Sequence, residues 1–361
     1  MSGKRLVLVI TQVLFFLGWS GLAGTAKADS LAQIIEGAKK EGTVSVKLAS
    51  TLAPKGIKRL EREIQKRFGV DLNIQFTPTG SFGKELGEFT MEHKVRMTPT
   101  YDLITSSEAY IAPGIKDGVF QRVDWKPFFT EDTNPEMALE HPLVRGSVVN
   151  YTGYLGLMIN PEKVPAGEFP KAWADLANPK WQGKVGMLNV ASTYARWAYV
   201  LGKEKMAADL RAVVKNKPII GRYADQLNRY LLGEVWMGFV TSSYTQAAKE
   251  KGVPVVFQGL DFVEEARYLL ALRTGAAHPN AAKLVAVYLS TPAGAKFMLE
   301  AAAKGNSLYP GNFEHDLRKQ LEAQGATIYA RTAYPGLLEF LLSKEFAKWE
   351  KEMNLILKGT G

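Results

Sequence analysis

Cysteine is absent from this chain of 361 residues, which excludes both a disulfide framework and a lipid-modified cysteine. Long apolar runs are missing as well, since no segment approaches the roughly 18 apolar residues of a membrane-spanning helix. Hydrophobic residues make up 46% and charged residues 22% of the chain, proportions that are typical of a soluble globular protein. We therefore expect stability to come from hydrophobic cores alone, in two domains at this length.

Recognisable catalytic motifs are also missing. The sequence contains no HExxH, GxSxG, phosphate-binding P-loop or dinucleotide-binding glycine pattern. The four histidines are scattered over positions 93, 141, 278 and 315, and His278 precedes Pro279 as a helix-entry residue would. We expect a protein that is not an enzyme and that carries no cofactor.

The N-terminus has the three parts of a secretory signal. Lys4 and Arg5 are followed by a largely apolar stretch from Leu6 to Leu17 and by Ala26-Lys27-Ala28, a small-x-small cleavage site. The stretch of about 12 residues is too short to span a bilayer comfortably. We therefore interpret residues 1–28 as a cleavable signal peptide, and expect a free, monomeric periplasmic protein that begins at Asp29.

The positive charge is modest and spread out. Loss of Lys4, Arg5 and Lys27 with the signal lowers the formal net charge from +9 to +6. Basic and acidic residues alternate, as in KRLERE from Lys58 to Glu63, which is typical of a solvated surface. Export and the absence of a basic stripe argue against a nucleic-acid partner, whereas a mild positive field favours a small anion.

Helix and strand patterns alternate in the first part of the mature chain. Helical periodicity ends at Gly42 and again at Gly69, and short β-rich runs follow each glycine. The pattern predicts helices over 30–41, 54–68 and 84–97, and strands over 43–49, 70–76 and 103–105. This order is typical of a mostly parallel sheet that is covered by helices.

Two β-rich passages divide the remaining chain. We interpret residues 145–160 as strands that enter a second lobe, and residues 266–272 as the return to the first. Thr291-Pro292 supplies an N-cap and a first-turn proline, and the tail over 311–361 is expected to be helical with a turn at 334–336. The predicted lobes are 29–144 with 266–310, and 145–265 with 311–361.

The same hydroxyl triplet follows two predicted strands. Thr105-Ser106-Ser107 ends the strand before one helix, and Thr241-Ser242-Ser243 ends the apolar run Val235–Val240 before another. In open α/β sheets, ligands bind just beyond the carboxyl ends of such strands, so these hydroxyls are expected to face a cleft. The alternative is that they only cap helices.

Four segments taken in order resemble a known family. They are WADLANPKWQGK from Trp173, GEV from Gly233, GAAHPNAAK from Gly275 and LSTPAG from Leu289. They resemble the extracellular solute-binding proteins of ABC transporters, in the branch that includes ferric-iron binders. The resemblance implies an α/β, two-lobed periplasmic-binding-protein fold with a strand hinge and a central ligand cleft, and delivery of the ligand to a membrane permease.

The iron-binding members of this family use a His after the first strand, a Glu after the third and a Tyr-Tyr pair after a later strand. This chain has Ser50-Thr51 at the first position and Ser243-Tyr244 at the last, with Glu108 near the Glu position. Tyr244 and Glu108 would supply only two protein ligands to ferric ion, which prefers several anionic oxygens. We therefore expect no metal, with a site built on Tyr244 and Glu108 as the alternative.

The predicted ligand is a small oxyanion or organic acid. Helix N-termini carry unpaired N–H groups and a partial positive charge, which suit an anion without a metal. Arg222 is a candidate for a bidentate contact, or else a surface residue, and Tyr244 either stacks on the ligand or packs within its helix. The predicted ligand-binding residues are Ser50, Thr51, Gly80, Ser81, Ser106, Ser107, Ser192, Thr193, Arg222, Ser243 and Tyr244.

Overall fold

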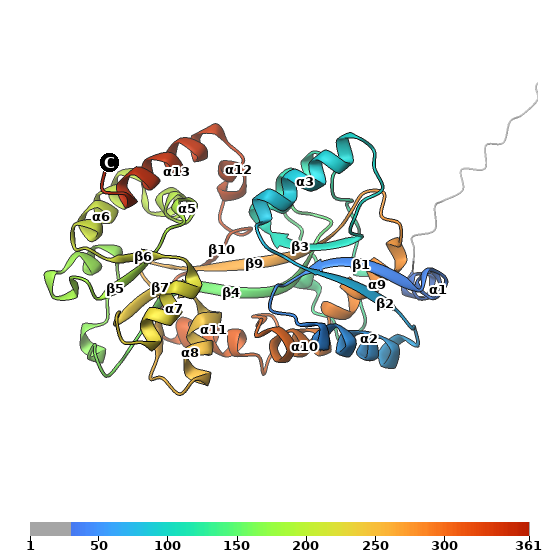
Figure 1. Cartoon of the computed structure of the whole chain (residues 1–361), viewed down its shortest axis with the longest axis horizontal. Coiled ribbons are helices and arrows are strands. Elements are labelled where there is room, and N and C mark those ends of the chain that lie inside the picture. The colour runs from blue at the N-terminus through green and yellow to red at the C-terminus, as the bar shows by residue number, and fades with distance from the viewer. Residues whose placement is uncertain (1–29, 361) are drawn as a thin grey trace, which may run out of the picture.

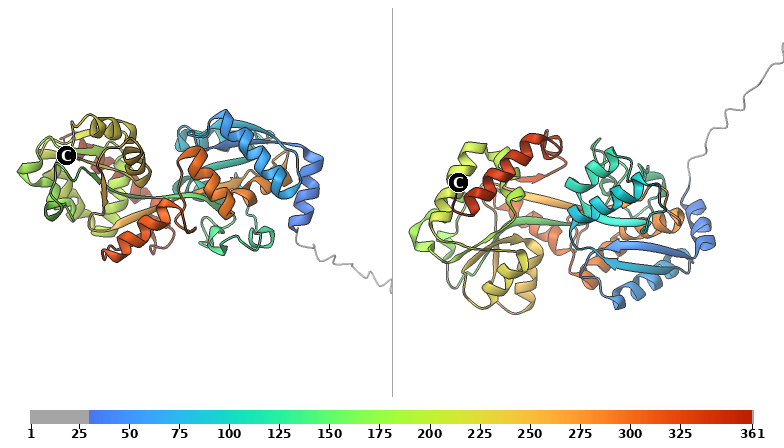
Figure 2. Two further views of the ribbon diagram at one scale, coloured as in Figure 1. Left: turned by 90° about the horizontal axis from the view of Figure 1, so that it is seen from below. Right: turned by 45° about the horizontal axis from the view of Figure 1, so that its top comes forward.

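Two long strands run through the middle of the molecule and join its two lobes (Figures 1 and 2). They are β4 (Val148–Ile159) and β9 (Val263–Leu272), which pair antiparallel with Tyr151 opposite Tyr268. Every residue of β4 is buried, which explains its almost unbroken apolar and aromatic composition. This computed structural model describes residues 30–360, so the predicted signal peptide, residues 1–28, lies outside the described residues.

The described strands form one sheet that passes through both lobes in the order β2-β1-β3-β9-β4-β7-β5-β6, with β10 beside β9 and β8 beside β4. Strands β1, β2 and β3 are parallel in one lobe, and β5, β6 and β7 are parallel in the other. Besides β4 and β9, the strands are β1 (Thr43–Leu48), β2 (Asn73–Pro78), β3 (Leu103–Ser107), β5 (Val185–Leu188), β6 (Ile219–Gly221), β7 (Met237–Thr241), β8 (Val256–Gln258) and β10 (Ile328–Ala330).

Helices cover both faces of this sheet (Figure 1). Those of the first part of the chain are α1 (Leu31–Glu41), α2 (Pro54–Phe68), α3 (Phe82–Lys94), α4 (Glu108–Lys116), α5 (Ala191–Leu201), α6 (Lys203–Lys215), α7 (Tyr223–Leu231) and α8 (Ser242–Glu250). They are followed by α9 (Pro279–Leu289), α10 (Pro292–Ala302), α11 (Phe313–Ala323), α12 (Leu337–Leu341) and α13 (Lys344–Leu357). None of the helices within residues 30–360 has the length and apolar character needed to cross a membrane.

Local sequence signals explain several helix ends. Gly42 and Gly69 end α1 and α2 with φ angles of 64° and 66°, in the left-handed region that glycine adopts without a steric penalty. The side chain of Thr291 accepts a hydrogen bond from the N–H of Gly294, and Pro292 is the first residue of α10. The N-cap predicted for this helix is therefore confirmed.

Each lobe has its own hydrophobic core. In the first lobe, Ile34, Val46 and Leu103 pack with Val285 of α9 and Leu270 of β9. In the second, Trp173 and Trp197 pack with Met237 and with Ile356 of α13. Helix α12 lies between the lobes, in contact with α4 of the first and with α5 and α13 of the second. The division of the chain between lobes at exact residues stays a prediction.

Two elements differ from the sequence-based expectations. The passage over 145–160 forms a single continuous strand, β4, rather than several short ones. The tail over 311–361 is not wholly helical, because residues 328–330 form β10, which pairs parallel with residues 263–265 of β9. A run of three residues carries too little periodicity to be recognised as a strand, and its pairing partner supplies the missing stabilisation.

Candidate functional site

Aromatic side chains from both lobes meet at the crossing strands. Tyr268 of β9 stacks on Tyr151 of β4 with ring centroids 4.4 Å apart and an interplanar angle of 20°. Phe82, the first residue of α3, lies 6.1 Å from Tyr268 and 6.2 Å from Tyr110 of α4. The first lobe therefore brings two rings to the pair that the crossing strands supply.

The second lobe adds two more rings. Tyr223 begins α7, Tyr244 lies in the first turn of α8, and the two rings stack at 5.6 Å and 13°. Burial raises the pKa of both phenols, and the neighbouring Tyr268 raises it further. The six residues Phe82, Tyr110, Tyr151, Tyr223, Tyr244 and Tyr268 are called the interlobe aromatic cluster below.

A buried carboxylate on β9 holds two arginines beside this cluster. Glu264 pairs with Arg196 of α5 at 3.2 Å and with the Nε of Arg331, which follows β10 directly, and its second oxygen accepts from Trp197 at 2.9 Å. Although burial acts to raise the pKa of Glu264, the two guanidinium groups lower it to about 2. Glu264 is therefore ionised at neutral pH, and it fixes the positions of Arg196 and Arg331.

Glu108 contributes a second carboxyl group from the first lobe. It is the first residue of α4, is fully buried, and lies 3.4 Å from Arg331 Nη1 through Oε2. Burial raises its pKa to about 7, against the opposing charge of Arg331. Its Oε1 has no hydrogen-bond partner, and neither has the buried hydroxyl of Ser106.

Two arginines face two buried carboxyl groups at this place. Glu264 is ionised, whereas burial raises the pKa of Glu108 to about 7. Arg196 and Arg331 also oppose the rise in the pKa of Tyr268, because their charges act on its phenol. An anionic group near Tyr268 would be attracted by both guanidinium groups.

Three of the residues predicted from the sequence lie at this place. Ser107 is opposite Tyr268 in the pairing of β3 with β9, whereas Ser106 is opposite Leu269, so its side chain lies on the other face of the sheet. Thr193 accepts a hydrogen bond from Arg196 at 3.3 Å, and Tyr244 is part of the cluster. The side chain of Ser107 makes no capping hydrogen bond to α4.

Three further predicted residues directly precede a ring of the cluster. Ser81 and Arg222 are exposed, and each adopts the N-cap backbone conformation of the helix that follows, α3 and α7 respectively. Ser243 precedes Tyr244, and its hydroxyl lies 3.0 Å from that of Thr241. Their involvement in binding stays a prediction.

Two of the remaining predicted residues make hydrogen bonds within the first lobe. Thr51 donates to the carbonyl of Ala302 in α10 at 2.7 Å, and the N–H of Gly80 donates to Glu85 at 2.5 Å. Ser50 is exposed in the turn after β1, and Ser192 is half-buried in the first turn of α5. No contact recorded for these four side chains or N–H groups joins them to the aromatic cluster.

Ser242, in the second hydroxyl triplet, joins two helices of the second lobe. Its hydroxyl is buried and donates to both oxygens of Glu314 in α11, at 2.6 and 2.8 Å, while it accepts from the N–H of Tyr154. It therefore connects α8 to α11, beside a pocket that these two helices line with β8. Alternating directions along a chain separate neighbouring side chains, so three adjacent hydroxyls do not share one environment.

Metal binding receives no direct support from side-chain geometry. Within residues 30–360, no group of three or more His, Asp and Glu side chains is arranged to hold an ion. Glu108 pairs with Arg331, and the raised pKa of Tyr244 disfavours the phenolate that ferric ion requires. For ferric ion to bind the alternative pair, Tyr244 would have to lose its proton and Glu108 would have to leave its ion pair with Arg331.

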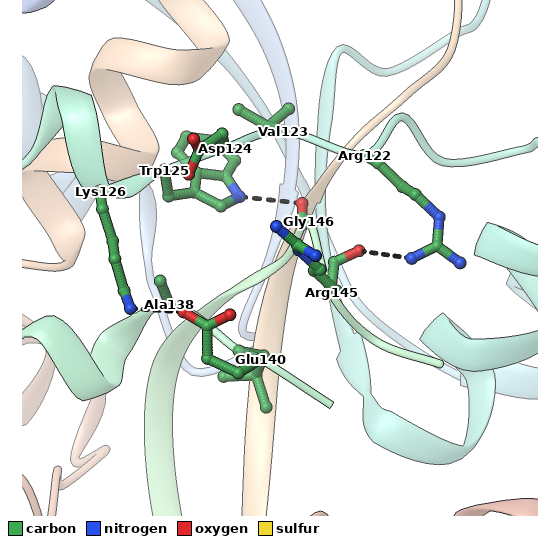
Figure 3. A pocket seen from close by; sticks show the side chains of 10 residues that line it. Arg122, Val123, Asp124, Trp125, Lys126, Ala138, Glu140, Arg145 and Gly146 are labelled. Atoms are coloured by element: carbon green, nitrogen blue, oxygen red, sulfur yellow. Dashed lines mark hydrogen bonds and ion pairs between the residues drawn. The ribbon is translucent and has the colours of Figure 1, made fainter. Parts of the chain in front are cut away.

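A separate cavity of about 540 Å³ lies in the first lobe (Figure 3). Arg122, Lys126 and Arg145 line it together with Asp124 and Glu140. Lys126 pairs with Glu140, and Arg122 donates to the carbonyl of Arg145 at 3.4 Å. This cavity contains none of the predicted ligand-binding residues, and its charged side chains are exposed to solvent.

Sequence reasoning missed the ion-paired centre of the site. One signal for it was available, because Glu264 and Glu265 stand side by side in VEEARYLLAL, an otherwise apolar strand. Charged residues in a buried strand need partners of opposite charge. The identity of those partners was not accessible from the sequence, since Arg196 and Arg331 belong to distant segments.

Two α/β lobes, two crossing strands and a cluster of side chains between the lobes define a two-lobed binding protein. The sequence model of the bacterial extracellular solute-binding protein family matches residues 98–316, which is more than half of the chain. The protein therefore belongs to that family. The resemblance and the fold class predicted from the sequence are therefore confirmed. No curated protein sequence matches the chain.

Solved structures of binding proteins share the fold. A substrate-binding protein of an ABC transporter from Agrobacterium tumefaciens aligns with a TM-score of 0.69 and 15% identity, over 93% of this chain and 96% of that one. Iron-bound HitA from Pseudomonas aeruginosa aligns at 0.64 and 17%, over 86% and 99%. The IdiA (FutA) protein of Trichodesmium, in complex with iron and citrate, aligns at 0.64 and 16%, over 87% and 99%.

Proposed function

We propose that this protein is the periplasmic solute-binding component of an ABC importer, and that it captures a small anionic solute between its lobes for delivery to the membrane permease. The protein acts as a monomer and catalyses no reaction. The observation that carries the proposal is the pair of arginines, Arg196 and Arg331, held by Glu264 beside Tyr268. Both arginines are less than 10% exposed, so an anion there would interact at reduced dielectric screening.

Both lobes contribute polar groups to the candidate site, which supports this proposal. The arginines belong to the second lobe, whereas Ser107 and Glu108 end β3 and begin α4 in the first. The N-terminus of α4 adds partial positive charge from its unpaired N–H groups. A ligand that contacts both sides binds the closed arrangement better than the open one, and so favours it.

A thermal-shift screen of the mature protein tests the proposal, with phosphate, sulfate, small carboxylates, phosphonates, polyamines and ferric citrate as probes. A ligand at about 100 times its dissociation constant adds about 2.7 kcal/mol of stability. Stabilisation by at least one anion, and none by polyamines, is expected.

Two variants then locate the site. Arg196→Lys keeps the charge but loses the planar fork, so affinity for the stabilising anion should fall by about 5- to 150-fold. Arg59→Lys is the matched control, because Arg59 pairs with Glu300 on the surface of the first lobe. Equal effects of the two variants, or stabilisation by polyamines instead of anions, would contradict the proposal.

A ferric chelate is the second candidate ligand. Tyr223, Tyr244 and Tyr268 bring three phenols together, and two of the similar structures hold iron, one of them with citrate. Phenolate binding to ferric ion would colour the protein through a charge-transfer band. Colour on addition of ferric citrate that Tyr244→Phe bleaches would favour this candidate over a metal-free anion.

A further inference from the structure

Apolar side chains are exposed together where α3 ends, on the first lobe (Figure 1). Met91 and Val95 lie one helical turn apart and are each 60% exposed, and Met97 in the following loop is 58% exposed. Within residues 30–360, only one other large apolar side chain, that of Leu232, is more than half exposed. Single exposed apolar residues are ordinary, whereas a group of them marks a contact surface. Met91, Val95 and Met97 are called the α3 patch below.

The α3 patch borders a depression of about 610 Å³. Its three side chains line this depression together with the ring of Phe89. Gly87 also lines it, and no neighbouring atom lies within 4 Å of the position that a Cβ on Gly87 would take. The patch is therefore one continuous, open apolar surface and not three separate side chains.

The two acidic residues that line the depression already have partners. Glu88 lies 3.8 Å from Lys84, one turn earlier in α3. Glu92 pairs with the buried Arg273 at 3.1 Å and accepts a hydrogen bond from Thr100. Their negative charges are thus balanced within the first lobe.

Two cations beside the patch have no such partner. Lys94 ends α3, Arg96 follows two positions later, and both are exposed and make no ion pair with any of residues 30–360. Arg96 has a φ of 56°, in the left-handed region, and the N–H of Met97 donates to the carbonyl of Glu92 at 3.0 Å. This turn holds Met97 beside α3. Basic and apolar side chains therefore alternate over residues 94–97.

An anionic membrane surface fits this combination better than a protein does. A specific protein interface takes about 800 Å² from each partner and draws on aromatic anchors, whereas the patch offers three aliphatic side chains above the buried ring of Phe89. A second copy of the chain would bring like charges together across a two-fold axis. A bilayer takes a few apolar side chains into the boundary between headgroups and acyl chains, while neighbouring Lys and Arg side chains reach the phosphates.

We propose that the end of α3 docks the protein on a membrane surface that contains anionic phospholipid. The α3 patch enters the boundary between headgroups and acyl chains, and Lys94 and Arg96 pair with lipid phosphates. The contact is reversible, because so few side chains take part. It involves no residue of the interlobe aromatic cluster, and it does not depend on which solute is bound.

Co-sedimentation with lipid vesicles tests the proposal, with the mature protein that begins at Asp29. Vesicles of phosphatidylcholine alone are compared with vesicles of phosphatidylcholine and phosphatidylglycerol. At least about 5-fold more protein is expected on the anionic vesicles, since each basic side chain near an anionic surface adds to the attraction. Added salt should release the protein, because exposed charges are screened over roughly 10 Å at 0.1 M salt.

A pair of charge variants locates the contact. Lys94→Gln combined with Arg96→Asn removes two positive charges, and Asn tolerates the left-handed conformation at position 96. This variant should bind anionic vesicles at least about 5-fold more weakly. Lys55→Gln combined with Arg62→Gln is the matched control, because it removes the same charge from exposed residues of α2. The control should bind as the unaltered protein does.

A second pair tests the apolar part. Met91→Ser combined with Met97→Ser should also weaken binding by about 5-fold or more, because two apolar side chains no longer enter the bilayer. Leu232→Ser is the control, since Leu232 is 73% exposed on the second lobe. Thermal unfolding should be nearly the same in all four variants, because every altered side chain is exposed.

Four results would overturn the proposal. They are no binding to anionic vesicles, equal loss in the α2 control, binding only to vesicles that contain a membrane protein, and self-association in sedimentation velocity that Met91→Ser abolishes. The third result would assign the patch to a protein partner, and the fourth to a second copy of the chain. Retained binding in the methionine variant would refute insertion of the α3 patch. Capture of a solute between the lobes stands or falls separately, since its probes and variants concern Arg196.

Discussion

Ser107→Ala and Thr291→Ala form a matched pair that separates ligand binding from helix capping. Both residues precede a helix and both adopt the extended N-cap conformation. Only Thr291 uses its side chain as a cap, accepting from the N–H of Gly294 at 3.0 Å while donating to the carbonyl of Tyr288 at 2.7 Å. The hydroxyl of Ser107 makes no such bond.

The expected losses of stability follow from these contacts. Loss of the Thr291 cap costs about 1 to 2 kcal/mol. The Tyr288 carbonyl keeps the N–H of Thr291 as a donor, so the second bond adds at most about 1 kcal/mol. Thr291→Ala should therefore lower the free energy of unfolding by about 2 kcal/mol, and Ser107→Ala by less than about 0.5 kcal/mol.

Affinity should change in the opposite order. Ser107 lies opposite Tyr268 where the proposed anion binds, so its removal is expected to weaken the stabilising anion by about 5-fold or more. Thr291 makes its side-chain hydrogen bonds within the junction of α9 and α10, and its removal should leave affinity unchanged. Urea unfolding and calorimetric titration measure the two quantities. A large loss of stability in Ser107→Ala with unchanged affinity would refute this reasoning and restore the capping interpretation.

Two further predictions concern stability. Burial raises the pKa of Glu314 to about 8, with Glu265 adding to the rise and Ser242 and Lys304 opposing it. An acid with a raised pKa in the folded state contributes stability that is fully present below about pH 4.5 and lost as the pH rises through about 8. Urea midpoints at pH 5 and pH 8 should therefore differ less in Glu314→Gln than in the unaltered protein; an unchanged difference would argue against a neutral Glu314. Gly87→Ala in α3 should stabilise by about 0.5 to 1 kcal/mol, since nothing lies near an added Cβ, whereas Gly294→Ala should destabilise by at least about 1 to 3 kcal/mol, since its Cβ would lie 2.1 Å from the Tyr288 carbonyl. Thermal unfolding that ranks the two variants the other way would contradict the packing around α10.

Short-range sequence signals predicted much of the fold. Gly42, Gly69 and Thr291-Pro292 set helix ends through backbone conformation and capping, which depend on a few neighbouring residues. Alternating helix and strand patterns likewise predicted the parallel strands, because periodicity reports which face is buried. These features are readable from short segments, and the structure contains them.

The centre of the candidate site was not readable in this way. Glu108 pairs with Arg331, which lies more than two hundred positions later, after a strand of only three residues. Tyr223 and Phe82 directly follow Arg222 and Ser81, two residues that the sequence analysis selected, yet ring contacts between different elements leave no periodic trace in the sequence. The ring and ion-pair contacts depend on tertiary structure, and a role of the hydroxyl residues in ligand binding stays a prediction.

The way each core is assembled also constrains how the chain can fold during its synthesis. Trp173 and Trp197 are made in the middle of translation, but Met353 and Ile356, which pack with them, come from the last helix. The first lobe likewise needs Val285 of α9 to cover residues near its beginning. Contacts between such remote positions slow folding, because a long loop must close before they form. The core of the second lobe can therefore be completed only after nearly the whole polypeptide has been made.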